Sequence, residues 1–369
     1  MSIPVAASSD VPDPSNILEL LNGFRRSAVL LSAVRLGIFD AIASSPCNLS
    51  QLALRLQLAS KATPDTDAVD VDSLSRLLSA CTSLNLLSNS GSEGNYSLSP
   101  ASAAFLTSSS PCSLAGYALH SANVVYPLFG GLHHSVQSGQ PCWQEQLGRS
   151  GSELFAHVYR TPEALLSFMT GMHSFAQLLQ SFDLSWVRTA VDIGGATGAV
   201  MLAAARLLPG LQSAFVVDLE PVVQAGRSHF SKPPFVSEVE ASALLSRVHW
   251  LAADMFLQPD RIPGGVDLVV MTRILHDWDP PRVTQLMKLA WDKLRPGGAL
   301  LLGEMLLKDN IHNAATNPAA VLQDLNMLVQ TGGRERDLAE YTQLLYDAEF
   351  NLVRGRITGS YLDAIIAVK

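Results

Sequence analysis

Charged residues are scarce in this sequence. They make up 16% of its 369 residues, and the acidic side chains outnumber the basic ones to give a formal net charge of −8. Nucleic acids and anionic membrane surfaces bind proteins through basic patches, and no basic tract offsets the negative balance here. Neither is therefore expected as the main partner. Hydrophobic residues, at 48%, are abundant enough for a large core and for an apolar surface that a second copy of the chain covers.

Long apolar runs are also missing. No run reaches the roughly 18 residues of a membrane span, and residues 1–10 lack both the positive start and the apolar core of a secretory signal. We therefore expect a cytoplasmic protein with no membrane partner. The four cysteines are widely spaced, which gives neither a C-x-x-C metal motif nor a dense disulfide framework, so buried free thiols are predicted. They are Cys47, Cys81, Cys112 and Cys142.

The first part of the chain has the order of elements found in winged-helix domains. A disordered leader is predicted over residues 1–14, and a helix that is capped at Ser15 or Asn16 and ends at Gly37 follows it. Helices over 49–56 and 72–84 precede a hairpin that pairs residues 86–87 with 96–98. Arg76 is the single basic residue of the second of these helices, and the hairpin loop has no Lys or Arg, which disfavours DNA binding. A helical, winged-helix dimerisation domain is predicted over residues 15–110.

Residues 111–186 are rich in aromatic, methionine and histidine side chains, and we predict that they form connecting helices that line the substrate pocket. Such a set suits a pocket for a flat substrate, to which we assign Phe168 and Met172, although each such side chain could equally be ordinary helix core. Adjacent His133 and His134 cannot both reach one metal ion from one face of a helix, so no metal site is predicted.

Residues 187–369 alternate strands and helices at the spacing of a parallel α/β sheet. One helix begins with Asp279 as its cap, carries a buried stripe from Val283 to Leu294, and ends at residues 296–298, before a strand over 299–304. The last two runs, 351–358 and 362–368, are close enough in sequence to pair antiparallel. The predicted sheet is therefore mostly parallel, with an antiparallel strand at the end.

The clearest motif is a strand, a glycine-rich turn and a helix over residues 189–208. Gly194, Gly195 and Gly198 let a ligand approach the backbone closely, and the start of the helix offers unpaired N–H groups. The dinucleotide fingerprint G-x-G-x-x-G is not met, because Ala196 and Ala199 occupy two of its positions. Taken alone, the turn is equally typical of any α/β domain.

Three successive strands of this region carry an acid at or near their ends. Asp192 lies in the strand before the glycine turn, Asp218 ends the next strand, where it suits ribose hydroxyls, and Asp254 ends the third, where it suits an adenine amino group. The turn contains no Lys or Arg and no Walker lysine. This pattern favours a cofactor with a cationic centre and no phosphate, and S-adenosylmethionine fits that description.

Further motifs resemble a known family. The sequences RILHDW at 273–278 and LRPGG at 294–298, taken with the glycine turn, resemble the small-molecule O-methyltransferases of the caffeate and hydroxyindole type. Residues 326–331 and 362–366 resemble the acetylserotonin branch of that family, and the resemblance extends from Ile17 to the C-terminus. It implies a Rossmann-like class I methyltransferase sheet in an S-adenosylmethionine-binding catalytic domain over 187–369, and a homodimer. It also implies methyl transfer to the hydroxyl of a small aromatic substrate: N-acetylserotonin, giving melatonin, or a related hydroxyindole or phenol.

His276 is the candidate general base. It follows the strand over 266–272 at the carboxyl edge of the sheet, where open α/β sheets hold their ligands, and an imidazole suits proton removal near neutral pH. Glu304 ends a strand and Glu335 follows two glycines, so either carboxylate could orient the imidazole. The family resemblance implies a histidine flanked by two glutamates, and these three residues match those positions. Without it, a strand-end glutamate is more often a salt-bridge partner.

The resemblance also implies ligand contacts elsewhere in the chain. Asp277, Asn326 and Gln330 match substrate contacts, whereas Arg273 and Tyr159 match cofactor contacts. The full predicted cofactor set is Asp192, Gly194, Gly195, Gly198, Asp218, Asp254, Met255, Arg273 and Tyr159.

Three alanines depart from the family pattern. Ala196 replaces the third glycine of the turn, Ala253 replaces a glycine before Asp254, and Ala176 replaces a tryptophan that contacts the cofactor. The first two changes are expected to be mild because alanine is small. The third removes a stacking surface. A catalytically weak relative that binds the cofactor in a structural or regulatory role therefore remains the alternative.

Overall fold

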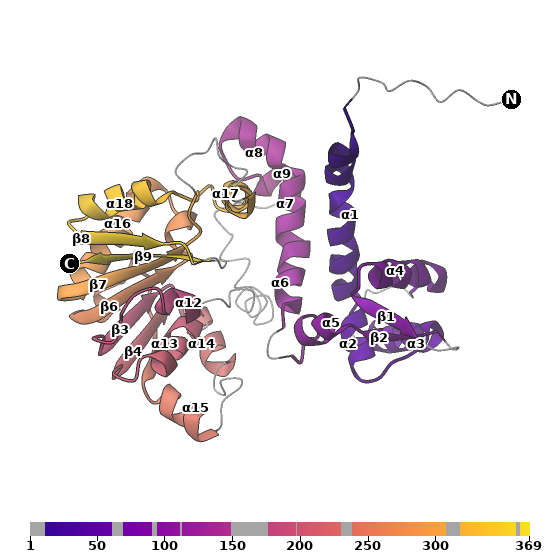
Figure 1. Cartoon of the computed structure of the whole chain (residues 1–369), viewed down its shortest axis with the longest axis horizontal. Helices are drawn as coiled ribbons and strands as arrows, with labels where there is room; N and C mark the ends of the chain where they lie inside the picture. The colour runs from indigo at the N-terminus through magenta and orange to yellow at the C-terminus, as the bar shows by residue number, and fades with distance from the viewer. Residues whose placement is uncertain are drawn as a thin grey trace. The chain divides into compact units, whose positions relative to one another are not determined.

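A computed structural model describes residues 12–60, 69–90, 94–110, 113–148, 176–196, 198–229, 238–307, 318–358 and 362–369. The chain divides into two compact units, Met1–Ala122 and Asn123–Lys369, whose elements are labelled in Figure 1. Within the described ranges, no helix is both long enough and apolar enough to cross a membrane.

The first unit is helical with one small hairpin. Its elements are α1 (Ser15–Arg35), α2 (Ile38–Ala43), α3 (Leu49–Ser60), α4 (Val71–Ser83), β1 (Leu87–Ser90), β2 (Asn95–Leu98), α5 (Pro100–Phe105) and α6 (Ala115–His120). Strands β1 and β2 pair antiparallel, with Leu87 opposite Leu98. The predicted cap of α1 was wrong, because Pro14 occupies the N-cap position and Ser15 donates from its backbone and hydroxyl to Asp13.

Helix α1 has two different halves. Its last turns pack Ala33 and Val34 into the core of the first unit together with α2, α3 and α4. Its first three turns carry large apolar side chains that remain exposed. These are Ile17, Leu18, Leu20, Leu21 and Phe24, each more than half exposed. Apolar side chains gathered on one exposed helix are typical of a surface that another chain covers.

The second unit contains a seven-stranded sheet with the order β5-β4-β3-β6-β7-β9-β8. Its strands are β3 (Thr189–Ile193), β4 (Ser213–Asp218), β5 (Val248–Ala252), β6 (Val266–Thr272), β7 (Leu294–Glu304), β8 (Asn351–Arg356) and β9 (Asp363–Val368). Strands β5, β4, β3, β6 and β7 are parallel, whereas β9 runs antiparallel to both β7 and β8. The predicted sheet, mostly parallel with an antiparallel last strand, is confirmed.

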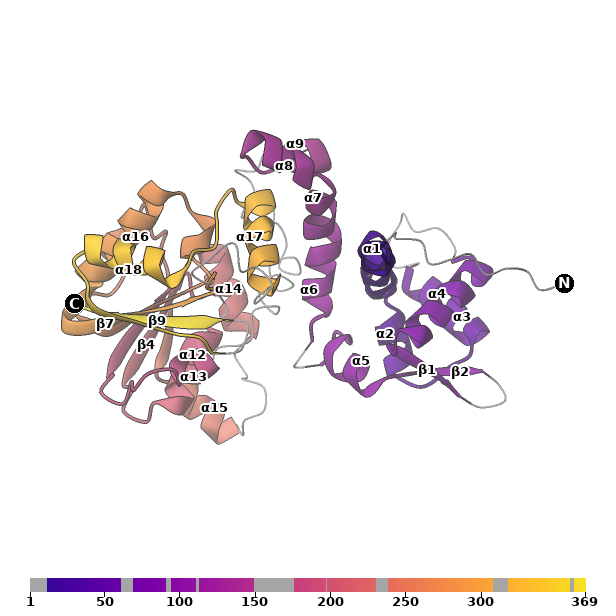
Figure 2. The same ribbon diagram turned by 45° about the horizontal axis from the view of Figure 1, so that its top comes forward.

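Helices cover both faces of this sheet, as Figure 2 shows. Helices α12 (Ala176–Leu179), α13 (Ala199–Leu207) and α15 (Glu238–Leu245) lie on one face, where the core includes Ala190, Ala214 and Leu268. Helices α16 (Pro280–Lys293) and α18 (Leu338–Asp347) lie on the other, against Val191, Val269 and Leu300. Because successive strand residues point to opposite faces, burial on both sides explains the nearly continuous apolar runs of the sequence.

The remaining elements of this unit connect or flank the sheet. They are η1 (Ser121–Val125), which crosses the boundary between the units, α7 (Tyr126–Gly130), α8 (Leu132–Ser138), α9 (Trp143–Leu147), α14 (Glu220–His229), η3 (Pro259–Arg261), η4 (Leu275–Asp277) and α17 (Pro318–Gln330). Trp143 and Cys142 of the α9 region form a small apolar cluster with Val329 of α17.

The boundary between α16 and β7 differs from the prediction. The helix ends at Lys293, and Leu294 already pairs with Val266 of β6 in the sheet. Arg295 then binds the Asp267 carboxylate through its guanidinium group. Leu294 is buried as predicted, but as a strand residue, because pairing with β6 replaces the last helical turn.

Candidate active site

The acids and the histidine singled out in the sequence lie at one edge of the sheet. Asp192 and Asp218 lie at the carboxyl ends of β3 and β4, and Asp254 follows β5 by two residues. His276 lies in η4 directly after β6, and Glu304 ends β7. Since these five strands are parallel, their carboxyl ends share one edge, which is where open α/β sheets bind ligands.

The glycine turn after β3 is held by Asp218. Its Oδ2 accepts a hydrogen bond from the Ala196 N–H at 2.9 Å, and its Oδ1 accepts one from the Leu219 N–H at 2.8 Å. Gly194 and Ala196 both have left-handed backbones, with φ of 74° and 47°. A left-handed conformation costs a residue with a Cβ about 1–2 kcal/mol. The alanine in place of the third glycine is therefore accommodated at a cost in strain.

Asp192 is a buried carboxylate in need of a partner. Its side chain is fully buried, and neither of its oxygens accepts a hydrogen bond from any residue in the described ranges. Burial raises the pKa of Asp192 to about 8, and the nearby charge of Asp218 adds to this effect. Gly195 lies directly against it, since a Cβ there would be 2.8 Å from Asp192 Oδ2. An unpaired buried carboxylate is costly, so this position suits a cationic ligand group.

The segment after β5 forms a tight turn around Asp254. Its Oδ1 accepts hydrogen bonds from the Phe256 and Leu257 N–H groups, at 2.8 and 3.0 Å. Met255, the residue after Asp254, is half-buried. The Ala253 N–H donates to the Asp218 carbonyl at 2.9 Å, which joins this turn to the end of β4.

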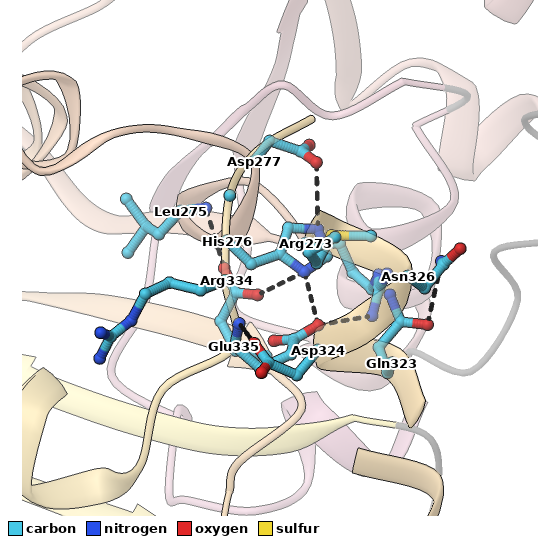
Figure 3. A network of polar contacts seen from close by, with 12 residues as sticks. Arg273, Leu275, His276, Asp277, Gln323, Asp324, Asn326, Arg334 and Glu335 are labelled. Carbon is cyan, nitrogen blue, oxygen red and sulfur yellow. Dashed lines mark hydrogen bonds and ion pairs between the residues drawn. The ribbon is translucent and has the colours of Figure 1, made fainter. Parts of the chain in front are cut away.

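His276, Glu304 and Glu335 meet in one buried cluster, of which Figure 3 labels His276 and Glu335. Imidazole Nδ1 lies 2.8 Å from Glu335 Oε1 and 3.7 Å from Glu304 Oε2, whereas Nε2 lies 3.7 Å from Asp277 Oδ1. The two ring nitrogens therefore face different partners. Nδ1 is engaged by a carboxylate, and Nε2 points toward Asp277.

The two glutamates make different contacts. Glu335 makes the short hydrogen bond to the imidazole. Glu304 Oε1 instead accepts hydrogen bonds from the backbone N–H groups of Ile274 and Leu275, at 3.2 and 3.0 Å. Glu304 thus holds the turn that carries the histidine, while Glu335 contacts the ring itself.

Burial sets the protonation of this cluster. Burial lowers the pKa of His276 from its usual value, and the positive charge of Arg273 lowers it further, while Asp277 and Glu304 oppose the shift. Burial also raises the pKa of Glu335 to about 7. At neutral pH the imidazole is therefore neutral. With Glu335 ionised, Nδ1–H donates to it and the lone pair of Nε2 remains available to accept a proton.

Comparison with known proteins decides the family. A family model of the O-methyltransferase domain matches residues 129–351, and one of the O-methyltransferase dimerisation domain matches residues 18–108. The chain belongs to the O-methyltransferase family. Acetylserotonin O-methyltransferase from Bos taurus is 34% identical to it over 362 residues, which cover 96% of this chain and 97% of that protein.

Other relatives of this methyltransferase support the same family. The "probable bifunctional dTTP/UTP pyrophosphatase/methyltransferase protein" of Homo sapiens is 34% identical over 366 residues, which cover 97% of this chain. The chain spans about half of that protein's length, namely 54%. The crystal structure of human N-acetylserotonin methyltransferase in complex with SAM has a TM-score of 0.81 at 29% identity and covers 98% of this chain and 99% of that chain. The predicted enzyme class and the cofactor S-adenosylmethionine are confirmed.

Helix α17 carries the predicted substrate contacts of the methyltransferase. Gln330 Nε2 donates to Asn326 Oδ1 at 2.7 Å. The two side-chain amides are one helical turn apart and lie on the same face of the helix, as their spacing predicts. Trp143 Nε1 donates to the Gln330 carbonyl at 2.6 Å, which holds the end of the helix. Asp324, on the same helix, accepts a hydrogen bond from the Glu335 N–H at 2.8 Å. Helix α17 is therefore connected to the histidine cluster through Glu335.

One predicted cofactor residue lies beside His276 and Glu335, and three predicted residues lie outside the described ranges. Arg273 is predicted as a cofactor contact, and its Nη1 lies 3.7 Å from Glu335 Oε1. Tyr159, Phe168 and Met172 lie outside the residues that the structure describes.

Sequence reasoning missed three residues of this region. Asp324 and Arg336 support the histidine cluster from positions that carry no sequence signal of their own. Gly333 packs so closely that a Cβ there would lie 1.9 Å from the His276 carbonyl oxygen. Two consecutive glycines before Glu335 were the available signal for such a close approach.

We expect the substitution Asp218→Ala to weaken S-adenosylmethionine binding at least about tenfold. It removes a charged acceptor that holds the glycine turn at the carboxyl edge of the sheet, and such an acceptor is worth on the order of 1.5–3 kcal/mol. Isothermal titration calorimetry measures the change. Glu220→Ala, two residues away at an exposed position, is the matched control and should bind normally. Equal affinities of the two variants would remove Asp218 from the cofactor site.

Proposed function

We propose that this methyltransferase transfers a methyl group from S-adenosylmethionine to the hydroxyl of a small aromatic acceptor, with N-acetylserotonin or a related hydroxyindole preferred, and that His276 is the general base. The observation that carries the proposal is the buried His276–Glu335 pair, which leaves Nε2 as the acceptor atom at the ligand-binding edge. The similarity to acetylserotonin O-methyltransferase over nearly the whole chain supports the choice of acceptor.

His276, Glu335 and Glu304 would each have a different role in methyl transfer. The bound cofactor supplies a methyl group on a positively charged sulfur, so the chain must align the acceptor oxygen and remove its proton. With the cofactor bound, His276 Nε2 would take the hydroxyl proton as the methyl group passes from the sulfur, whose bond to it breaks, to the acceptor oxygen. The imidazolium that results keeps its Nδ1–H on Glu335, whose negative charge stabilises it. Glu304 holds the turn of residues 274–277 in place through two backbone N–H groups.

The cofactor would be held by the edge formed by β3, β4 and β5. Asp218 and the turn of Gly194, Gly195 and Gly198 would bind its nucleoside. Asp254 and Met255 would lie around its adenine ring. Asp192 offers its buried carboxylate to the cofactor's positive charge. Arg273 and Tyr159 complete the proposed set.

The acceptor would be recognised by polar groups on one side and apolar groups on the other. The amides of Asn326 and Gln330 suit an amide side chain and an indole N–H, and Asp277 lies next to the base. Phe168 and Met172 are proposed as the apolar wall for the aromatic ring.

A methylation assay with labelled S-adenosylmethionine tests this function. The acceptors are N-acetylserotonin, caffeate, flavonoids and simple phenols, and we expect the highest kcat/KM for N-acetylserotonin or another hydroxyindole. One ligand atom each from His276, Glu304 and Glu335 lies within 4.8 Å of the others, a spacing that a metal ion also accepts. The assay is therefore repeated with a chelator, and activity should not change.

The alternative function is cofactor binding without efficient turnover. Two features favour it: Ala176, where the acetylserotonin enzyme has a tryptophan, and the strained backbone of Ala196. Calorimetry separates the two functions. S-adenosylmethionine that binds tightly to a protein that methylates none of the acceptors would support the structural or regulatory role and overturn the enzymatic proposal.

Separate substitutions of the two glutamates should have different effects. Glu335→Gln replaces the charge that stabilises the imidazolium, so we expect kcat to fall about tenfold or more with little change in thermal stability. Glu304→Gln weakens the hold on two backbone N–H groups, so the melting temperature should fall as well. Steady-state kinetics and thermal denaturation measure both. Each substitution should lower kcat by a smaller factor when His276 is already replaced, because a carboxylate that orients the imidazole has no effect on kcat once the imidazole is absent. Fully additive losses would contradict these roles.

We also propose that the enzyme is a homodimer built through α1. The dimerisation-domain match over residues 18–108 and the exposed apolar residues of the first turns of α1 support it. Leu20→Asp should weaken the dimer at least about tenfold, because a buried leucine contributes roughly 1.5–3 kcal/mol. Light scattering across a concentration series measures this, with the similarly exposed Leu352→Asp of β8 as control. A parent protein that is monomeric and active at micromolar concentration would count against the dimer.

A further inference from the structure

Arg336 connects the two segments that carry the proposed base and its carboxylate partner. Its side chain is buried, and its Nη1 donates to the Leu275 carbonyl at 3.1 Å and to the Arg334 carbonyl at 3.3 Å. Leu275 directly precedes His276, and Arg334 directly precedes Glu335. One guanidinium group therefore holds the backbone next to both members of the hydrogen-bonded pair.

The same two segments are joined at further points. The Arg334 N–H donates to the His276 carbonyl at 2.9 Å. The Arg336 carbonyl accepts from the Leu307 N–H at 3.0 Å, just beyond β7, whose last residue is Glu304. Tyr341 of α18 places its ring 5.9 Å from the guanidinium carbon. Arg336 thus lies where the β6 turn, the end of β7 and α18 meet.

A buried cation in this place has an energetic cost. Arg336 forms no ion pair with any carboxylate in the described part of the chain, and its polar partners there include two backbone carbonyls. Removing a guanidinium from water is unfavourable unless it is well compensated. The buried carboxyl groups of Glu335 and Asp324 provide such compensation, since the positive charge of Arg336 lowers the pKa of both, and the charge therefore acts on the cluster around His276.

We propose that Arg336 is a positioning residue for methyl transfer, which holds the turn of His276 against the segment of Glu335 and places a positive charge behind the imidazole. This inference rests on the proposed role of His276 as the base. By donating to a carbonyl of each segment, Nη1 fixes the distance between the two backbone segments, and through them the geometry of the His276–Glu335 hydrogen bond. Its role is thus distinct from that of Glu335, which contacts the ring.

The charges around the imidazole show what Arg336 contributes. The titratable and charged groups that surround it are Arg273 and Asp277 from its own turn, Glu304 from β7, Asp324 from α17, Glu335 and Arg336 from the following loop, and Tyr341 from α18. After burial and Arg273, the positive charge of Arg336 contributes to lowering the pKa of His276. Loss of the Arg336 charge should therefore raise the pKa of the imidazole.

NMR-monitored titration of the histidine side chains tests the proposal without relying on turnover. His276→Gln assigns the His276 signal, and the pKa is then compared in the parent, Arg336→Gln, Arg336→Lys and the control Arg354→Gln, an exposed arginine of β8. We expect Arg336→Gln to raise the pKa of His276. Arg336→Lys, which keeps the charge, should leave it near the parent value, as should the control.

Kinetics with the acceptor that the parent methylates best provide the second measurement. Arg336→Gln should lower kcat on the order of tenfold and move the acidic limb of its pH profile to higher pH, with KM for both substrates nearly unchanged. Arg336→Lys should lower kcat without moving the limb, because lysine keeps the charge but lacks the planar guanidinium group whose Nη1 reaches both carbonyls.

The outcomes separate a positioning role from a purely structural one. A lower melting temperature of Arg336→Gln with unchanged imidazole pKa and kcat would overturn the proposal. If Arg336→Gln does not fold, Arg336→Lys decides: reduced kcat at constant KM supports the proposal, and unchanged kcat overturns it. If the parent methylates no acceptor, the proposed function fails, and the NMR titration still decides whether Arg336 acts on the histidine.

Discussion

Replacing His276 with glutamine is expected to lower kcat by about 10²–10⁴-fold, the usual contribution of a general base. The affinity for S-adenosylmethionine should stay nearly constant, because the proposed base acts on the acceptor side of the methyl group. Stopped assays with saturating acceptor and calorimetry with the cofactor measure the two quantities. The exposed His249→Gln of β5 is the matched control and should retain full turnover.

The pH dependence of the same variant makes the prediction sharper. In the proposed mechanism, turnover is fastest with a neutral imidazole and an ionised Glu335, and burial places the pKa of Glu335 at about 7 and that of His276 below its usual value. As the pH falls, Glu335 gains its proton first and the imidazole follows. The kcat of the parent should therefore decrease on acidification from about pH 7, and His276→Gln should flatten this limb. Near-full turnover of His276→Gln on a good acceptor would show the histidine to be structural.

Adding one methyl group at Gly333 is the second change with a large expected effect. The Cβ of Gly333→Ala would lie 1.9 Å from the His276 carbonyl oxygen and 2.9 Å from the Asp277 carbonyl carbon. These are backbone atoms, so the clash can be relieved only by moving the turn that carries the base. We expect a loss of about 1–3 kcal/mol in stability and about 10²-fold in kcat, because a displacement of about 1 Å can cost that much.

Gly264→Ala is a suitable control for this change. The atom nearest to a Cβ there is Lys293 Cδ at 3.8 Å, an ordinary contact, so activity should not change. Thermal denaturation and steady-state kinetics on both variants make the comparison. A fully active Gly333→Ala would mean that the two segments are free to separate and that their close contact has no role in catalysis.

The positions of the strand-end residues could be predicted from sequence alone. Apolar runs mark where β4, β6 and β7 end, and parallel strands bring Asp218, His276 and Glu304 to one edge. The position of Glu335 could not be predicted in this way. Glu335 lies 59 residues from its partner His276 in sequence, and no periodicity relates the two, so its place depended on the family resemblance.

The errors and omissions have physical causes in the tertiary structure. Leu294 has the apolar spacing of a helix, yet sheet pairing with Val266 takes precedence over the last helical turn. Pro14 is the N-cap residue of α1, and the Ser15 hydroxyl, one of the two expected caps, donates to Asp13 instead. Arg336 has no pattern around it, and its role depends on which carbonyls the fold brings within its reach.

Helix α17 has a consequence for how the proposed site would select its acceptor. The helix carries Asn326 and Gln330, the proposed acceptor contacts, while Asp324 on the same helix holds the backbone of Glu335, the hydrogen-bond partner of His276. An acceptor of the wrong shape that displaces the helix by a few tenths of an ångström also displaces the carboxylate behind His276. Poor acceptors would then occupy the site and react slowly, so discrimination between phenols would be read in the rate of the chemical step more than in binding.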